Sequence, residues 1–385
     1  MSDLHLGMTQ SELERRGAQW TAREIEQQPR AWRRAAELLR ARAAAIDSFL
    51  RPLLASDDLR IVFTGAGSSA YIGQCLAPPL TRTLQRRVEA IATTDLVSGP
   101  HDYLLPRAPT LLVSFGRSGN SPESLAAVQA ADRVLARCHH LVITCNAAGE
   151  LYRRGDADPR SLALLLPEET HDRSFAMTSS FSSMLLAGRL ALTGTSAAGL
   201  VEPMAAAGER VLNRHEPALK ALAEAGHARV VFLGSKGLQG LAQEAALKLL
   251  ELTDGAVVSM AESPLGFRHG PKTIIDPDTL VVVFLSNDAL TRRYDVDLAS
   301  ELRREGRAQR VLTIGTRPDP ACPVEDHLLL PELDAAQDTE LMPAFVIAAQ
   351  IYALHRALLL GNSPDNPSVS GTVNRVVQGV TIHSF

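Results

Sequence analysis

Short apolar runs recur along the chain in one order, and stretches with helical periodicity separate them. The runs 60–65, 110–115 and 142–144 each have a similar run 169 residues later. A fourth run, 165–167, has a similar run 164 residues later. A nearly constant offset across several runs indicates an internal duplication. The sequence therefore predicts two related copies of one structural unit.

The runs are mostly β-branched and apolar at every position, as in strands that are buried on both faces of a sheet. The intervening segments, such as 124–138 and 238–252, have the periodicity of helices. Strands that alternate with helices form βαβ units and parallel sheets. We therefore expect an α/β protein with two domains, at 48–200 and 210–360, each a flavodoxin-like parallel sheet between two layers of helices.

Two segments lie outside the repeat, a helical leader at 1–47 and a tail at 361–385. An apolar stripe with arginines beside it runs along the leader, at Trp32, Ala35, Ala36 and Leu39. This pattern favours a helix packed on a domain over a basic helix that binds DNA. The leader is interrupted by Pro29 and shows no clear pair of short helices. The tail is expected to close over the active site, and its end, 376–382, resembles a strand.

The composition narrows the class of protein. With a formal net charge of −4 and 4% aromatic residues, the chain lacks the basic surface and the stacking platforms of many nucleic-acid proteins. No apolar run approaches the ~20 residues that span a bilayer, and the N-terminus lacks the features of a signal peptide. The four cysteines have no metal-binding spacing and are expected to be reduced thiols. We therefore expect a cytoplasmic protein without nucleic-acid or membrane partners.

Two loops of the first domain follow predicted strands, where ligands bind in open parallel sheets. They are 65–69 and 114–124. In the second loop, Gly119 lets the backbone turn its N–H groups inward. Ser121 and Pro122 are typical of an N-cap and a first helical residue. A helix N-terminus of this kind binds anions, so the predicted ligand is a phosphate.

Side chains in the second loop add to this prediction, since Ser118, Asn120 and Ser121 carry hydrogen-bond donors. A glycine-rich turn followed by an ordinary capped helix explains the same residues. Neither loop contains the GxGxxG spacing or a Walker sequence. Nucleotide binding is therefore disfavoured.

The second domain keeps the strands but lacks the glycine-rich loop, which predicts one composite site rather than two equal ones. Its predicted helix 238–252 carries Glu244, Lys248 and Glu251 on one face. A solvated face with weak ion pairs explains this spacing, and so does a set of acid and base groups. His269, on a stiff loop, is a further candidate for proton exchange. No metal-binding spacing occurs, so we expect no required metal.

These residues are similar to those of the sugar isomerase (SIS) domain family, whose phosphosugar-binding loop the segment 115–124 resembles. The tandem arrangement resembles the isomerase half of glutamine–fructose-6-phosphate amidotransferase, the glucosamine-6-phosphate synthase. The resemblance is closer to the AgaS-type galactosamine-6-phosphate deaminase/isomerases, also described as tagatose-6-phosphate ketose/aldose isomerases. It covers nearly the whole chain, in strings at 64–67, 93–96, 169–173, 175–180, 266–272 and 371–379.

The resemblance implies a role for most candidate residues. The family's phosphate-binding positions match Ser68, Ser69, Ser118 and Ser121. His269 matches the histidine that opens the sugar ring, which the neighbouring subunit supplies in the synthase. Glu251 matches the carboxylate that moves a proton between C1 and C2, and Lys248 and Glu244 match residues that assist. Further candidate substrate contacts are Gly67, Thr94, Arg117, Asn120, Thr178, Ser179 and Gln378. For Thr94, a simple turn is an equally good explanation.

Two departures from the synthase affect the expected reaction. The segment before the first domain is too short for a glutaminase. The tail of the synthase places a lysine near the substrate carbonyl, whereas the tail of this chain has Gln378 at the matching place. Both favour release of ammonia over its use. The implied reaction is isomerising deamination of galactosamine 6-phosphate to tagatose 6-phosphate and ammonia, without a cofactor, in a homodimer or higher homo-oligomer. A plain aldose–ketose phosphosugar isomerase and a non-catalytic phosphosugar-sensing regulator are the alternatives, and the sugar epimer is left open.

Overall fold

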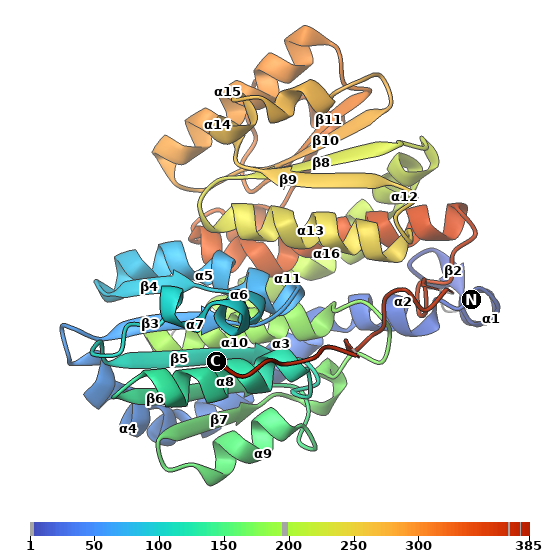
Figure 1. Cartoon of the computed structure of the whole chain (residues 1–385). Helices are drawn as coiled ribbons and strands as arrows, with labels where there is room; N and C mark the ends of the chain where they lie inside the picture. The colour runs from blue at the N-terminus through green and yellow to red at the C-terminus, as the bar shows by residue number, and fades with distance from the viewer. Residues whose placement is uncertain (1–3, 195–198, 369, 378) are drawn as a thin grey trace. The chain divides into compact units, whose positions relative to one another are not determined.

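The computed structural model describes residues 4–194, 199–368, 370–377 and 379–385 (Figure 1). The chain divides into two compact units, each built from several segments. The first-sheet unit contains residues 31–172, 179–199 and 371–385. The second-sheet unit contains residues 1–30, 173–178 and 200–370. The leader and the tail are therefore both divided between the two units.

A five-stranded parallel sheet forms the centre of the first-sheet unit, in the order β4-β3-β5-β6-β7. The strands are β3 (Arg60–Thr64), β4 (Arg87–Ala90), β5 (Thr110–Gly116), β6 (Cys138–Thr144) and β7 (Ser161–Leu165). Every position of β3 and β5 is buried, as expected for a sheet that is covered on both faces.

Helices cover both faces of this sheet. They are α3 (Gln28–Ala41), α4 (Ala43–Leu54), α5 (Ser68–Leu84), α6 (Thr93–Ser98), α7 (Pro100–Tyr103), α8 (Pro122–Val134), α9 (Glu150–Ala157) and α10 (Ser179–Thr193). On one face, Val62 and Leu112 form a core with residues of α6, α8 and α9. On the other face, Phe63 packs beside Gly73 of α5 and Phe115 packs beside Gly188 of α10. The prediction of a sheet between two helical layers is confirmed.

The second-sheet unit repeats this topology, with the order β9-β8-β10-β11-β12 (Figure 1). Its strands are β8 (Arg229–Gly234), β9 (Val258–Glu262), β10 (Thr279–Phe284), β11 (Arg310–Gly315) and β12 (His327–Leu329). Both sheets have the flavodoxin-like strand order. The duplication predicted from the sequence is therefore confirmed.

The strand register also repeats. Arg60 pairs with Thr110 in one sheet and Arg229 pairs with Thr279 in the other, both at the predicted offset. The next strand differs between the units, since Ser114 of β5 pairs with Val142 of β6 but Val283 of β10 pairs with Thr313 of β11. Val142 is therefore equivalent to Thr313, two residues beyond its match in the sequence. A two-residue shift preserves the face to which each side chain points, which is why the apolar strings still match.

The helices of the second-sheet unit also lie on both faces of their sheet. They are α11 (Val201–Arg210), α12 (Glu216–Glu224), α13 (Gly237–Leu252), α14 (Pro264–Phe267), α15 (Ala289–Glu305) and α16 (Asp338–Leu359). By length and composition alone α16 is able to cross a membrane, but 94% of its apolar window is buried inside the protein. It contacts α11, α12 and α13, and Phe345 stacks on Phe284 of β10. It is therefore a core helix.

The leader contains more helices than expected. Residues Leu4–His5 (β1) and Met8–Thr9 (β2) form a small hairpin, and α1 (Gln10–Arg15) and α2 (Gln19–Glu26) follow. The expectation that the leader lacks a pair of short helices is wrong, because Gly17, at φ +59°, allows a tight turn between α1 and α2. Pro29 does not interrupt the leader either, since it lies in the first turn of α3, where proline is tolerated.

The predicted apolar stripe of the leader is buried. Trp32, Ala35 and Leu39 have no exposed surface, and Trp32 Nε1 donates to Ser182 Oγ at 2.9 Å. The packed helix is therefore confirmed over the DNA-binding alternative. In the tail, the predicted strand at 376–382 does not form at its described positions, which are irregular.

Candidate functional site

The strand order of the first sheet reverses between β3 and β5. In doubly wound sheets, ligands bind at the carboxyl ends of the strands on either side of such a switch point. The loop 65–69 follows β3, and the loop 117–121 follows β5. The two loops with predicted phosphate contacts therefore flank the switch point.

The first loop turns sharply into α5. A Cβ at Gly65 would lie 2.5 Å from the Ser69 Cβ, so only glycine fits there. Gly67 has φ +56° and is the N-cap of α5, in a conformation that favours glycine. Ser68 and Ser69 are buried in the first turn. The loop thus combines two serine side chains with the N-terminal end of a helix, where the helix dipole favours negative charge.

The second loop ends in the capped helix that the sequence predicts. Ser121 is the N-cap of α8, and its Oγ accepts from the Ser124 N–H at 3.3 Å. Pro122 is the first helical residue. Gly119 has φ +64°, which turns the chain toward the helix. The N-terminal end of α8 is consequently a favourable place for negative charge.

Neighbouring loops hold this backbone in place. Thr144 Oγ1 donates to the Gly116 carbonyl at 2.6 Å, and Asn146 Nδ2 donates to the Ser118 carbonyl at 2.8 Å. Asn120 Oδ1 accepts from the Glu150 N–H at 2.9 Å. This contact gives Asn120 a positioning role at the start of α9, in addition to the donor role that the sequence suggested.

Three buried hydroxyl groups lie beneath these loops. Thr64 and Ser114 are register partners at the ends of β3 and β5, and Thr93 begins α6. Among the described residues, Thr64 Oγ1, Thr93 Oγ1 and Ser114 Oγ have no hydrogen-bond partner. Buried hydroxyl groups without a partner are costly. These three hydroxyl groups are therefore suited to contact with a polar ligand.

The remaining predicted contacts are distributed over both units. Thr94 is exposed on α6, and Arg117 is buried in the second loop. Ser179 is buried at the start of α10 in the first-sheet unit, and Thr178 is buried in the second-sheet unit. Gln378 lies outside the described residues.

Asp172, which was not among the predicted site residues, lies at the centre of a hydrogen-bond network. Its carboxylate is buried and accepts from Ser179 Oγ, from the Ser180 N–H at 2.9 Å and from Ser180 Oγ at 2.5 Å. Asp172 therefore positions the first turn of α10. The sequence signals Asp172 by its place in the string 169–173 and by the adjacent His171, with which it forms a potential acid/base pair.

The matching corner of the second sheet, formed by the loops that follow β8 and β10, has different contacts. Lys236 has φ 55° and ψ −126°, close to φ 56° and ψ −128° at Gly67. The N–H groups of Ser286 and Asn287 donate to the carboxylates of Asp295 and Asp338 at 3.0 and 2.8 Å. Burial raises the pKa of Asp295 to about 6. The donors that would bind a phosphate here are already bonded to acidic side chains.

The candidate acid and base residues of the second-sheet unit form one cluster on α13, in which Glu244 and Lys248 are buried and Glu251 is partly exposed. Glu244 has no exposed surface, and 1% of Lys248 is exposed. Lys248 Nζ lies 3.6 Å from Glu244 Oε1 and forms a second ion pair with Glu251. The predicted grouping on one face is confirmed. Burial argues against the solvated face, because Lys and Glu are rarely buried unless paired or functional.

His269 lies on a loop that is anchored on both sides. Arg268 pairs with Glu301 of α15 at 2.9 Å, and Lys272 pairs with Glu301 and Glu305. The imidazole is exposed and makes no hydrogen bond or ion pair with another described residue. The structure therefore fixes the loop without joining His269 to the cluster on α13.

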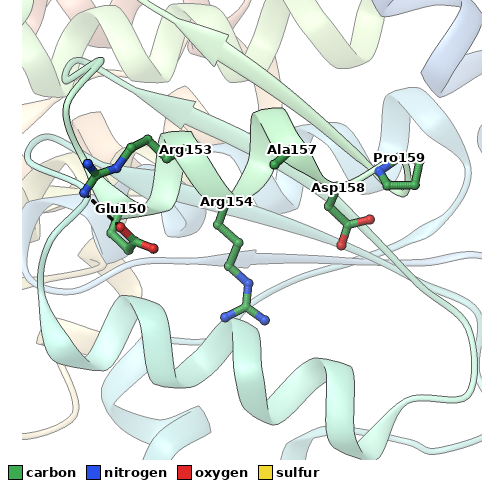
Figure 2. A pocket seen from close by; sticks show the side chains of 6 residues that line it. All are labelled: Glu150, Arg153, Arg154, Ala157, Asp158 and Pro159. Atoms are coloured by element: carbon green, nitrogen blue, oxygen red, sulfur yellow. Dashed lines mark hydrogen bonds and ion pairs between the residues drawn. The ribbon is translucent and has the colours of Figure 1, made fainter.

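An open depression runs along the outer side of α9, lined by Glu150, Arg153, Arg154, Ala157, Asp158 and Pro159 (Figure 2). Its arginines are paired, Arg153 with Glu150 and Arg154 with Asp132, both at 2.9 Å. It therefore lacks the unpaired positive charge of a phosphate site. Within the described ranges, no group of three or more His, Cys, Asp or Glu side chains is placed to hold a metal ion.

The fold and these loops define a protein with two sugar isomerase-type units. Residues 53–194 match the model of the SIS domain family. A D-galactosamine-6-phosphate deaminase AgaS from Escherichia coli is 47% identical over 377 residues, which cover 95% of this chain and 96% of that protein. A D-galactosamine-6-phosphate deaminase AgaS from Shewanella sp. (strain ANA-3) is 46% identical over 386 residues, with 100% and 96% coverage. The chain belongs to the AgaS family of SIS-domain proteins.

The solved structures agree with this placement. The crystal structure of tagatose-6-phosphate ketose/aldose isomerase from Escherichia coli superimposes with a TM-score of 0.88 at 43% sequence identity, and it covers 95% of this chain and 97% of that chain.

Proposed function

We propose that this protein catalyses the isomerising deamination of galactosamine 6-phosphate in the cytoplasm, giving tagatose 6-phosphate and ammonia. The observation that carries the proposal is the cluster of Glu244, Lys248 and Glu251, in which Lys248 and Glu244 are buried. Acid and base groups of this kind are needed for proton transfer next to a carbonyl. The names of the deaminase relatives support the choice of substrate.

The phosphate is assigned to the loops at the first-sheet switch point. Ser68, Ser69, Ser118 and Ser121 offer hydroxyl groups, and α5 and α8 begin here and direct their positive dipole ends to this place. Such donors bind a dianion through hydrogen bonds and helix dipoles, so a net charge of −4 is no obstacle. Anchoring the phosphate orients the other end of the sugar and lowers the entropic part of the barrier.

The reaction follows from carbonyl chemistry. His269 is assigned to ring opening, which exposes the C1 aldehyde. Glu251 removes the C2 proton, and the electron pair forms a C1–C2 double bond while O1 is protonated, which gives an enolamine. Return of a proton to C1 gives an imine at C2. Water adds to C2 and ammonia leaves, so one water is consumed for each ammonia released. Lys248 and Glu244 are assigned to the proton transfers at O1 and nitrogen.

A panel of four sugar 6-phosphates tests this proposal: galactosamine, glucosamine, galactose and glucose 6-phosphate. Ammonia and ketose are measured in each reaction. We expect one ammonia for each ketose with galactosamine 6-phosphate and no product from free galactosamine. Absence of ammonia from both amino sugars would refute deamination.

Glu251→Gln tests the assignment of the base. General acid–base catalysis contributes about 10²–10⁴-fold, so turnover is expected to fall by that factor while phosphate-dependent binding is kept. Glu224→Gln, at an exposed carboxylate on α12, is the matched control and should keep full activity. Unchanged turnover in Glu251→Gln would remove Glu251 from this role.

A plain aldose–ketose isomerase is the second candidate, and the name of the isomerase structure from Escherichia coli supports it. It uses the same proton transfer between C2 and C1 on a substrate with oxygen in place of nitrogen. Ketose formation from galactose 6-phosphate, with none from galactosamine 6-phosphate, would establish this alternative. A phosphosugar-sensing regulator would show neither reaction and would shift operator-length DNA in a gel.

We further propose that the active protein is a homodimer in which His269 acts on the partner's substrate. The exposure of the His269 imidazole on an anchored loop supports this. Mixing Glu251→Gln with His269→Asn protomers tests it, since each mixed dimer would contain one site with both native residues. Activity that stays at the level of the separate variants, in a mixture shown to exchange subunits, would contradict it.

A further inference from the structure

Beside the phosphate loop, the first-sheet unit holds a second group of polar residues that the proposed chemistry does not use. Arg117 Nη2 donates to the Arg375 carbonyl at 2.8 Å, and the Arg375 guanidinium donates to the Asp172 carbonyl. Arg375 therefore joins the tail to two segments that follow strands, the loop after β5 and the segment after β7. His171 lies in the second of these segments.

The His171 ring has an unused hydrogen-bonding atom. Its Nε2 is buried and has no hydrogen-bond partner among the residues that the structure describes. A buried polar atom of this kind normally finds a partner in protein or ligand. Burial, and then the positive charges of Arg375 and Arg117, hold the pKa of His171 below its usual value, while Asp172 opposes them. The imidazole is thus neutral near pH 7, with one donor and one acceptor nitrogen.

The place of His171 in the sheet matches the reach of a sugar phosphate. The strand order puts β6 between β5 and β7. Arg375 bonds to Arg117, in the loop after β5, and to Asp172, next to His171 in the segment after β7. The two segments are therefore linked through one residue, a span that a six-carbon sugar anchored by its phosphate at residues 118–121 can bridge. Both segments follow the carboxyl ends of their strands, where ligands bind in open parallel sheets.

The chemistry of the surroundings selects the kind of group that His171 contacts. The two guanidinium groups disfavour a substrate ammonium next to the ring, and the single phosphate is assigned to the loops. We propose that His171 Nε2 hydrogen-bonds a hydroxyl group of the bound sugar and that Arg375 is the positioning residue for this contact. The inference rests on the proposed function, since it takes galactosamine 6-phosphate as the ligand.

A double-mutant cycle between the protein and the substrate tests the inference. Binding of galactosamine 6-phosphate and of its 3-deoxy and 4-deoxy analogues is measured by calorimetry, in a Glu251→Gln background that prevents turnover. We expect His171→Ala to weaken binding of the full substrate about tenfold, the usual size of a hydrogen bond to a buried group. One deoxy analogue, which lacks the contacted hydroxyl, should bind equally with and without His171.

Equal weakening for all three ligands would overturn the inference, because a structural role predicts no dependence on a hydroxyl group. If His171→Ala does not fold, His171→Gln enters the same cycle under the same criterion. His139→Gln is the matched control, since His139 lies at the opposite end of β6 and should not affect any ligand. Ammonia release by the native protein is measured separately, so failure of the deaminase proposal is distinguishable from failure of the hydroxyl contact.

Discussion

Replacing Lys248 by methionine tests whether charge pairing holds the buried cluster on α13 together. The Lys248 Nζ lies 3.6 Å from Glu244 Oε1, and both side chains are almost completely buried. At an effective dielectric constant of about 20, two unit charges at this distance attract by about 5 kcal/mol. Desolvation offsets much of that attraction, but removal of one partner leaves a buried carboxylate without its cation. The expected loss of unfolding free energy is therefore about 3–5 kcal/mol.

The assay is equilibrium unfolding in urea of the native protein, Lys248→Met, Glu244→Gln and the double variant. The double variant should be more stable than Lys248→Met, because it no longer buries an uncompensated charge. Lys272→Met is the matched control. Lys272 also lies between two carboxylates, but 22% of its side chain is exposed, so its loss should change stability by less than about 1 kcal/mol. A Lys248→Met protein as stable as that control would refute the reasoning.

Three further predictions follow from the charges and backbone of the two units. Arg375→Gln should raise the pKa of His171, because it removes one positive charge and leaves Arg117 and Asp172 as the charged neighbours of the ring. The acidic limb of the kcat/KM profile should then move to higher pH. Arg375→Lys keeps the positive charge and should not move this limb. Lys236→Gly should stabilise the protein by about 1 kcal/mol, as measured by thermal unfolding. A non-glycine residue at φ 55° and ψ −126° is strained by about 1–3 kcal/mol, and the ion pair that Lys236 would lose is exposed and therefore weak. A destabilised variant would contradict this. The folded-state pKa of Asp295, about 6, is above its unfolded value. This group therefore makes the free energy of unfolding decrease as pH rises from about 4 to about 6. Asp295→Asn should remove that dependence, as measured by urea unfolding across this pH range.

The fold was predictable because the central strands β3, β5 and β10 are buried at every position and therefore have an uninterrupted apolar pattern. The Gly119–Ser121 turn was predictable because glycine and an N-cap serine each have a local reason to be there. The roles of Asn120 and Asp172 were not predictable, since each depends on a contact with another element: Asn120 contacts Glu150, 30 residues away, and Asp172 contacts Ser180, 8 residues away. The short helices α1 and α2 depend on the tight turn at Gly17, for which the apolar pattern gives no signal. Pro29 was misread because proline is compatible both with a break and with a first helical turn.

The asymmetry of the duplication explains how one fold supplies two kinds of chemistry. Gly67 and Lys236 share almost the same backbone angles, so the turn into the following helix is retained in both units. In the first-sheet unit the turn carries serines and no acidic side chain among residues 65–69. In the second-sheet unit Asp338 accepts from Ser286 and Asn287 and also pairs with Lys236. A phosphate would have to displace this carboxylate and face Asp288 nearby, so the second corner is closed to it. Since only the first-sheet unit keeps an open corner for a phosphate, we infer that each chain binds one phosphosugar.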